Sequence, residues 1–181
     1  MYIPVILGTA RKGRYSEKVA NFVFQEVKKA KIKTTLVDVR NYRIKATDNT
    51  EKIAPAKKFE RILKKADGLI IVSPEYNHSY PGELKMFLDM LFKQYYMKPF
   101  GICGVSNGNF GGARMVEQFM QLAANFRMVP AGVMYFPFVE ELFDKNNKIK
   151  DEKYYERTKR FLDELKKTIK SVKKSVKNKE K

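Results

Sequence analysis

Residues 3–16 read Ile-Pro-Val-Ile-Leu-Gly-Thr-Ala-Arg-Lys-Gly-Arg-Tyr-Ser, and this stretch decides the fold. The apolar run at 3–7 predicts a buried strand, and residues 8–16, with two glycines and two hydroxyl side chains, predict a tight turn. A helix is then expected from residues at helical spacing: Val19, Ala20, Val23 and Val27. This order is typical of a phosphate-binding site, because the turn amides and the positive end of the helix dipole face one point.

The same turn carries side chains that suit an anion. Thr9 and Ser16 can donate hydroxyl hydrogen bonds, and Arg11 can pair two phosphate oxygens through its planar guanidinium. Lys12 and Arg14 would raise the local positive potential. The alternative is an ordinary solvated basic turn whose helix is capped by Ser16. The residues alone leave both interpretations open.

Strand and helix patterns alternate along the whole chain. Besides 3–7, strands are expected at 33–39, 69–72, 99–105 and 129–136. Besides the helix after Ser16, helices are expected at 55–66, 84–95 and 113–127 and from 151 onward, with loops at 40–52 and 137–151. Because crossovers between parallel strands are right-handed, the sheet should carry helices on both faces. We expect an α/β flavodoxin-like three-layer sandwich with a five-stranded parallel sheet of order 2-1-3-4-5.

Three unusual loops follow strands one, three and four of this predicted sheet. They are residues 8–16, the proline-containing 73–82 and the glycine-rich 106–112. In the order 2-1-3-4-5 these three strands are neighbours, so the loops should meet at one edge, where ligands of such sheets bind. The convergence of three loops is stronger evidence for a site than any one of them.

Two familiar phosphate-binding motifs fit poorly. The spacing of Gly8 and Gly13 does not give a G-x-G-x-x-G fingerprint, and Arg14-Tyr15 replaces the lysine and hydroxyl of a Walker A loop. A mononucleotide with one phosphate and a flat ring fits better. The first loop would hold the phosphate, and the loops at 74–77 and 106–112 would offer backbone groups to the ring edge.

Three separated motifs agree in order and spacing with one known family. They are Gly8-Thr9-x-Arg11-x-Gly13-x-x-Ser16, then Pro74-Glu75-Tyr76-Asn77-x-Ser79-x-Pro81-Gly82, then Ser106-x-x-x-x-Gly111-Gly112-x-Arg114. Over roughly residues 2–137 the chain resembles the NADPH-dependent FMN reductase family. The resemblance implies bound FMN, with NADPH or NADH as hydride donor and a quinone, azo compound, free flavin or oxidised metal ion as acceptor.

The resemblance also implies roles for individual residues. Thr9, Arg11 and Ser16 would hold the phosphate; Pro74, Glu75, Tyr76 and Asn77 would line the flavin ring; Ser106, Gly108 and Gly111 would contact its pyrimidine side. A homodimer or homotetramer is implied, with residues 95–97 as an interface element or as ordinary core. Because the flavin performs the hydride chemistry, no catalytic side chain is expected.

A few other chemical groups have simpler interpretations. His78 could donate a proton near neutral pH, but an exposed loop residue is the preferred interpretation. Glu75 could be a general acid, and the preferred interpretation is a carboxylate that caps a neighbouring turn. The acidic residues at 140–144 have no histidine or cysteine companions, so no metal site is expected.

The charge is strongly basic, at +17 formally. Residues 166–181 hold eight lysines and one acid, a net +7, and we treat them as a lysine-rich helix end or tail after a domain spanning 1–165. Such a segment can contact nucleic acid or anionic lipid. No aromatic platform or recognised nucleic-acid motif accompanies it, so we interpret it as a solvated helix end and expect no nucleic-acid partner. A non-enzymatic electron-carrier flavoprotein is the alternative function, although carriers of that kind tend to be acidic.

The sequence also bears on where in the cell the protein is found. No apolar run approaches the ~20 residues that cross a bilayer, and no secretory signal pattern opens the chain, so no membrane partner is expected. The single cysteine, Cys103, cannot form an internal disulfide. A reducing cytoplasmic location is the simplest expectation.

Overall fold

The computed structural model describes residues 1–42 and 52–179. Its strands are β1 (Val5–Leu7), β2 (Leu36–Asp38), β3 (Leu69–Pro74), β4 (Pro99–Val105) and β5 (Val129–Phe136). Its helices are α1 (Ser16–Lys29), α2 (Ala54–Lys65), α3 (Gly82–Asp89), α4 (Ala113–Asn125) and α5 (Lys153–Lys179), with short 3-10 turns η1 (Val39–Tyr42) and η2 (Lys93–Tyr95). The strands pair in parallel in the order β2-β1-β3-β4-β5, which confirms the predicted sheet.

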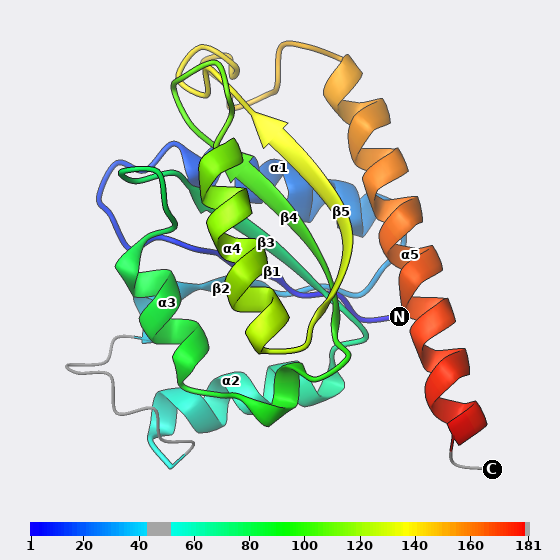
Figure 1. The fold of residues 1–181 in the computed structure, drawn as a ribbon. Coiled ribbons are helices and arrows are strands. Elements are labelled where there is room, and N and C mark those ends of the chain that lie inside the picture. The colour runs from blue at the N-terminus through cyan, green and yellow to red at the C-terminus, as the bar shows by residue number, and fades with distance from the viewer. Residues whose placement is uncertain (43–51, 180–181) are drawn as a thin grey trace.

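Two helical layers enclose this sheet (Figure 1). Helices α1 and α5 cover one face, and α2, α3 and α4 cover the other. Successive side chains of a strand point to opposite faces, so Ile6 packs with the second layer, whereas Val5 and Leu7 pack with the first. Burial on both faces explains why the central strands are continuous apolar runs.

Helix α5 lies close over the sheet because β4 and β5 carry glycines beneath it. A Cβ built on Gly101 would lie 2.3 Å from Cζ of Phe161, and one on Gly132 would lie 3.0 Å from Cδ2 of the same ring. Any larger residue at Gly101 would push the helix outward. The glycines of strand 99–105 predicted such a close approach, and the structure confirms it.

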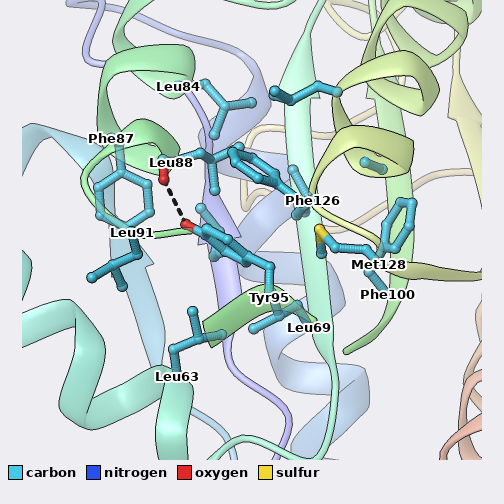
Figure 2. Packing of buried hydrophobic residues seen from close by; sticks show 14 of the residues in the cluster. Leu63, Leu69, Leu84, Phe87, Leu88, Leu91, Tyr95, Phe100, Phe126 and Met128 are labelled. Atoms are coloured by element: carbon cyan, nitrogen blue, oxygen red, sulfur yellow. Dashed lines mark hydrogen bonds between the residues drawn. The ribbon is translucent and has the colours of Figure 1, made fainter. Parts of the chain in front are cut away.

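The third helix is shorter than its apolar pattern predicted. Helix α3 ends at Asp89, and Tyr95 lies in the separate turn η2. Tyr95 is fully buried, its hydroxyl donates to the carbonyl of Leu88 at 3.0 Å, and its ring stacks on Phe126 (Figure 2). Apolar spacing could not separate one long helix from a shorter helix followed by a separate 3-10 turn. Of the proposed interface residues 95–97, Tyr95 therefore belongs to the core.

Other boundaries differ by a few residues. The second strand covers only Leu36–Asp38 of the predicted 33–39, although Lys33 forms an isolated bridge with Tyr2. The predicted loop at 40–52 begins with η1, and its residues 43–51 lie outside the described part of the chain. Within the described residues no helix is both long and apolar enough to cross a bilayer.

Candidate cofactor site

A pocket of about 330 Å³ opens at the carboxyl edge of the sheet. It is formed by the loops after β1, β3 and β4 and the residues that flank them, together with one residue from the loop after β5. Its lining residues are Arg11, Lys12, Gly13, Arg14, Tyr15, Ser16, Pro74, Glu75, Tyr76, Val105, Ser106, Asn107 and Val139. The predicted convergence of the three loops is therefore confirmed.

Two guanidinium groups hold the carbonyls of the first loop. Arg14 donates through Nη1 to the carbonyl of Thr9. Arg40 donates to the carbonyls of Ala10 and Arg11, over N–O distances of 3.2 and 2.7 Å. Carbonyl oxygens at a pocket would repel an anion, so their pairing with guanidinium groups favours anion binding by this loop.

The amides of the same loop are left available. Within the described chain, the backbone N–H groups of residues 12–16 donate to no other protein group. Helix α1 begins at Ser16, and its N-cap residue, Tyr15, makes no side-chain capping bond. These amides and the helix dipole create the positive end expected of a phosphate site.

Ser16 provides the most specific signal in the loop. Its Oγ is buried and has no hydrogen-bond partner among the described residues. Ser16 therefore does not cap the helix, contrary to the alternative drawn from the sequence. A buried hydroxyl without a partner costs about 1–3 kcal/mol, and a bound phosphate oxygen would remove this cost.

Arg14 was predicted to raise the positive potential of the first loop, but its charge is paired inside the protein. Its side chain is almost fully buried and forms an ion pair with Asp38 at the end of β2, and Nε lies 3.3 Å from Glu17. Burial alone would raise the pKa of Asp38, but hydrogen bonds from Arg14 and from the Arg40 amide outweigh it and lower that pKa. The charge of Arg14 is thus largely neutralised within the protein.

Arg11 is the arginine of this loop whose side chain is exposed at the pocket. Its guanidinium lies 5.6 Å from the ring centre of Tyr76. The Tyr76 hydroxyl is 3.1 Å from Oγ1 of the fully buried Thr9, which also accepts the Arg11 amide. Thr9 and Tyr76 therefore join the first loop to the second and leave Arg11 available to a ligand.

The second loop turns back on itself at Asn77 and His78. Both residues have positive φ, +49° and +64°, and backbone bonds of 2.8 and 3.0 Å join Tyr76 and Ser79 on either side. Asparagine tolerates this left-handed conformation well. Both side chains are exposed and neither lines the pocket, which agrees with the preferred interpretation of His78.

Glu75 and Gly112 shape the entry to helix α4. The Glu75 carboxylate accepts the Met115 amide at 3.3 Å and lies 3.9 Å from Arg114, so it caps the helix as preferred above. Gly112 has φ of +86°, and a Cβ there would lie 2.7 Å from the Val105 nitrogen. Only glycine fits at this point, because both the conformation and the space exclude a side chain.

The rim of the pocket contains an interaction that the sequence did not predict. Glu140 accepts hydrogen bonds from Asn107 at 2.9 Å and from the Tyr15 hydroxyl at 2.7 Å, and its amide donates to Asn107 at 3.0 Å. The bond to Glu140 raises the pKa of Tyr15. Partners this far apart in the chain leave no spacing signal, so Tyr15, Asn107 and Val139 could not be identified from the sequence.

The sequence-predicted residues fall into two groups. Those that line the pocket are Arg11, Ser16, Pro74, Glu75, Tyr76 and Ser106. Thr9 lies behind the loop, and Asn77, Gly108 and Gly111 are not part of the lining. Among the residues that the structure describes, no three His, Cys, Asp or Glu side chains gather in a way that could hold a metal ion.

Comparison with known sequences identifies the family. The sequence model of the NADPH-dependent FMN reductases matches residues 1–141. The chain belongs to this family. The match spans the loops after β1, β3 and β4, which form most of the pocket, so the resemblance seen in the three motifs is confirmed.

Individual known proteins are similar to this chain over most of their length. The NAD(P)H-dependent FMN reductase LOT6 of Saccharomyces cerevisiae is 24% identical over 179 residues, covering 82% of this chain and 93% of the relative. A quinone reductase of Pseudomonas putida is 27% identical over 160 residues, covering 83% and 85%. The solved structure of FerB, a flavoenzyme NAD(P)H:(acceptor) oxidoreductase of Paracoccus denitrificans, superposes with a TM-score of 0.76 at 18% identity, covering 96% and 97%. This last similarity supports the flavodoxin-like fold.

Proposed function

We propose that this FMN reductase family member is an FMN-dependent oxidoreductase that uses NAD(P)H to reduce a small-molecule acceptor. The observation that carries the proposal is the buried Ser16 hydroxyl, which has no partner in the described chain and lies beside unpaired loop amides. An unsatisfied donor in an amide-lined turn fits a phosphate monoester better than it fits solvent.

In the first loop, some groups would donate hydrogen bonds to the phosphate and others would hold the loop in shape. The amides of residues 12–16 and the Ser16 hydroxyl would donate to the phosphate oxygens, and the exposed Arg11 guanidinium would pair with two of them. Arg14 and Arg40 would act indirectly, by holding the loop carbonyls. Thr9 is a positioning residue, because its hydroxyl is already bonded to Tyr76 and to the Arg11 amide.

The remaining lining would hold the flavin ring. Pro74, Glu75 and Tyr76 on one side and Ser106 and Asn107 on the other bound the rest of the pocket. When bound, FMN would supply two-electron hydride transfer between NAD(P)H and the acceptor. The protein would orient the ring and leave one of its faces open to both partners in turn.

A quinone is the acceptor we propose, since two of the related proteins described above are an NAD(P)H-dependent FMN reductase and a quinone reductase. The purified protein, with FMN bound and excess FMN removed, should under oxygen-free conditions sustain oxidation of NADPH or NADH only when a soluble benzoquinone is added, with parallel lines in double-reciprocal plots. An electron-carrier flavoprotein would bind FMN and give almost no turnover without a partner reductase. Failure to retain FMN would contradict the proposal at its first step.

We also propose a homodimer or homotetramer in the cytoplasm. The exposed aromatic side chains of Phe92 and Tyr96, on either side of η2, support a contact between subunits there. A molar mass from light scattering equal to one chain would contradict the oligomer. Replacing both residues with serine should shift that mass toward the monomer.

A further inference from the structure

The end of helix α5 carries a one-sided row of lysines. Between residues 166 and 178 the sequence has six lysines and no acid: Lys166, Lys167, Lys170, Lys173, Lys174 and Lys177. At 3.6 residues per turn, these six positions fall within a sector of about 120° around the helix. With a rise of 1.5 Å per residue the row is about 16 Å long. We call these six residues the lysine stripe.

The body of the protein holds the stripe in place. Leu165 and Ile169 are buried, and a Cβ on Gly68 would lie 2.8 Å from Ile169, so the helix is packed tightly against the start of β3. Lys173 is ion-paired with Asp67, and Lys166 with Asp163 at 2.5 Å. Within the described chain, the four other lysines have no acidic partner within ion-pair distance.

The stripe and the cofactor pocket lie at opposite ends of the molecule. Figure 1 shows the end of α5 extending beyond the amino ends of the strands, whereas the pocket loops follow the carboxyl ends of β1, β3 and β4. A large anionic partner could therefore cover the stripe without blocking the pocket.

The chemistry of the stripe favours nucleic acid over a lipid surface. Interfacial helices gain much of their affinity from apolar burial, and among residues 166–178 the one exposed apolar side chain is Val176. A bilayer on this side would also leave the pocket facing away from it. A basic helix face instead matches a duplex, which presents one phosphate charge per ~1.7 Å and a groove that admits an α-helix.

We propose that the lysine stripe is a docking surface for double-stranded nucleic acid, contacted through its phosphates and without sequence preference. The composition of the tail led us to expect no such partner. The structure adds that the lysines are held on one side of an ordered, projecting helix. This proposal is independent of the proposed enzymatic function.

The test measures binding of the full-length, FMN-saturated protein to a fluorescent 20-base-pair DNA duplex by polarisation. With four unpaired lysines on phosphates, the logarithm of the binding constant should fall with the logarithm of salt at a slope of about −3.6. Between about 50 and 200 mM salt this slope corresponds to a loss of affinity of about 150-fold.

Two variants with the same change in net charge separate the stripe from bulk charge. The stripe variant replaces Lys167, Lys170, Lys174 and Lys177 with glutamine, which keeps a similar helix propensity. The control replaces the exposed Lys145, Lys148, Lys150 and Lys153 with glutamine, at the opposite end of α5 and in the loop before it. The stripe variant should lose most of the affinity and of the salt slope, and the control should keep most of both. Equal losses in both variants would overturn the proposal.

Binding to lipid vesicles tests the alternative that the lysine stripe contacts a membrane surface. Binding to phosphatidylserine vesicles that needs the stripe, with no saturable binding to the duplex at about 50 mM salt, would overturn the proposal in favour of a membrane surface. No binding to either probe would overturn it in favour of a merely solubilising helix end. Melting curves and FMN retention of both variants should match those of the unmodified chain.

Discussion

The Arg14 guanidinium donates to both carboxylate oxygens of Asp38, over N–O distances of 2.8 and 2.5 Å, and also to the Thr9 carbonyl. This one side chain fastens the turn after β1 to the end of β2, the neighbouring strand. Because Arg14 is buried, it depends on Asp38 for its counter-charge. The shape of the proposed phosphate loop therefore depends on a residue that lies outside the loop.

Replacing Asp38 with asparagine should destabilise the protein. It would leave a buried guanidinium without its main counter-charge, at a cost of about 3 kcal/mol in the free energy of unfolding, the low end for a buried pair because Asp38 is partly exposed. Glu17→Gln is the matched control, since this second carboxylate partner of Arg14 is half exposed and should contribute less than about 0.5 kcal/mol. Urea unfolding measures both. Equal losses of unfolding free energy in the two variants would contradict the prediction that Asp38 is the main counter-charge of Arg14.

The same pair predicts a pH dependence. The pKa of Asp38 is lowered in the folded protein, so its contribution to stability is present above the unfolded pKa, about 3.9, and is lost as pH falls through the folded pKa. The stability difference between the unmodified chain and Asp38→Asn should be constant above about pH 5 and shrink in stronger acid. Asp67 and Asp163 also have lowered pKa values, but they titrate in both proteins and cancel in the difference. A difference that grows with acid would contradict this prediction.

Ser16→Ala should have opposite effects on stability and on cofactor binding. Without FMN, removing a buried hydroxyl that has no partner should leave the free energy of unfolding unchanged or raise it by up to about 1 kcal/mol. Loss of a hydrogen bond to phosphate should weaken FMN binding about tenfold, measured by quenching of flavin fluorescence. Thr34→Val is the control, because Thr34 Oγ1 is also buried without a partner but lies far from the pocket. Unchanged FMN affinity in Ser16→Ala would argue against the phosphate assignment.

Cys103 should be inert in the folded protein. It is fully buried in β4, and burial raises the pKa of its thiol, so little reactive thiolate forms near neutral pH. A disulfide reagent such as Ellman's should react with less than about 0.1 thiol per chain until denaturant is added, and then with one. Because the chain has one cysteine, the measurement needs no mutant. Rapid labelling of the native protein would show that β4 opens locally.

Much of this protein could be predicted from local sequence patterns. Apolar runs and helical spacing depend on neighbouring residues, so they predicted the alternating elements, and the handedness of crossovers predicted a parallel sheet with helices on both faces. The strand order 2-1-3-4-5 came from the expected flavodoxin-like fold, which the resemblance to the FMN reductases also implied. The same sheet order brought the loops at 8–16, 73–82 and 106–112 to one edge. Arg11 and Ser16 could be predicted as pocket residues because their residue types and spacing within one turn suit a phosphate, and both line the pocket; their contact with phosphate remains a proposal.

Only the tertiary structure decided which side chains remain available to a ligand. Arg14 and Arg11 are equally basic in the sequence, yet Arg14 is neutralised by Asp38, which comes from another strand. The pairing of Glu140 with Tyr15 and Asn107 and the burial of Tyr95 also depend on residues far apart in the chain. Charge pairing and burial are properties of distance in space, and spacing along the chain carries no record of them.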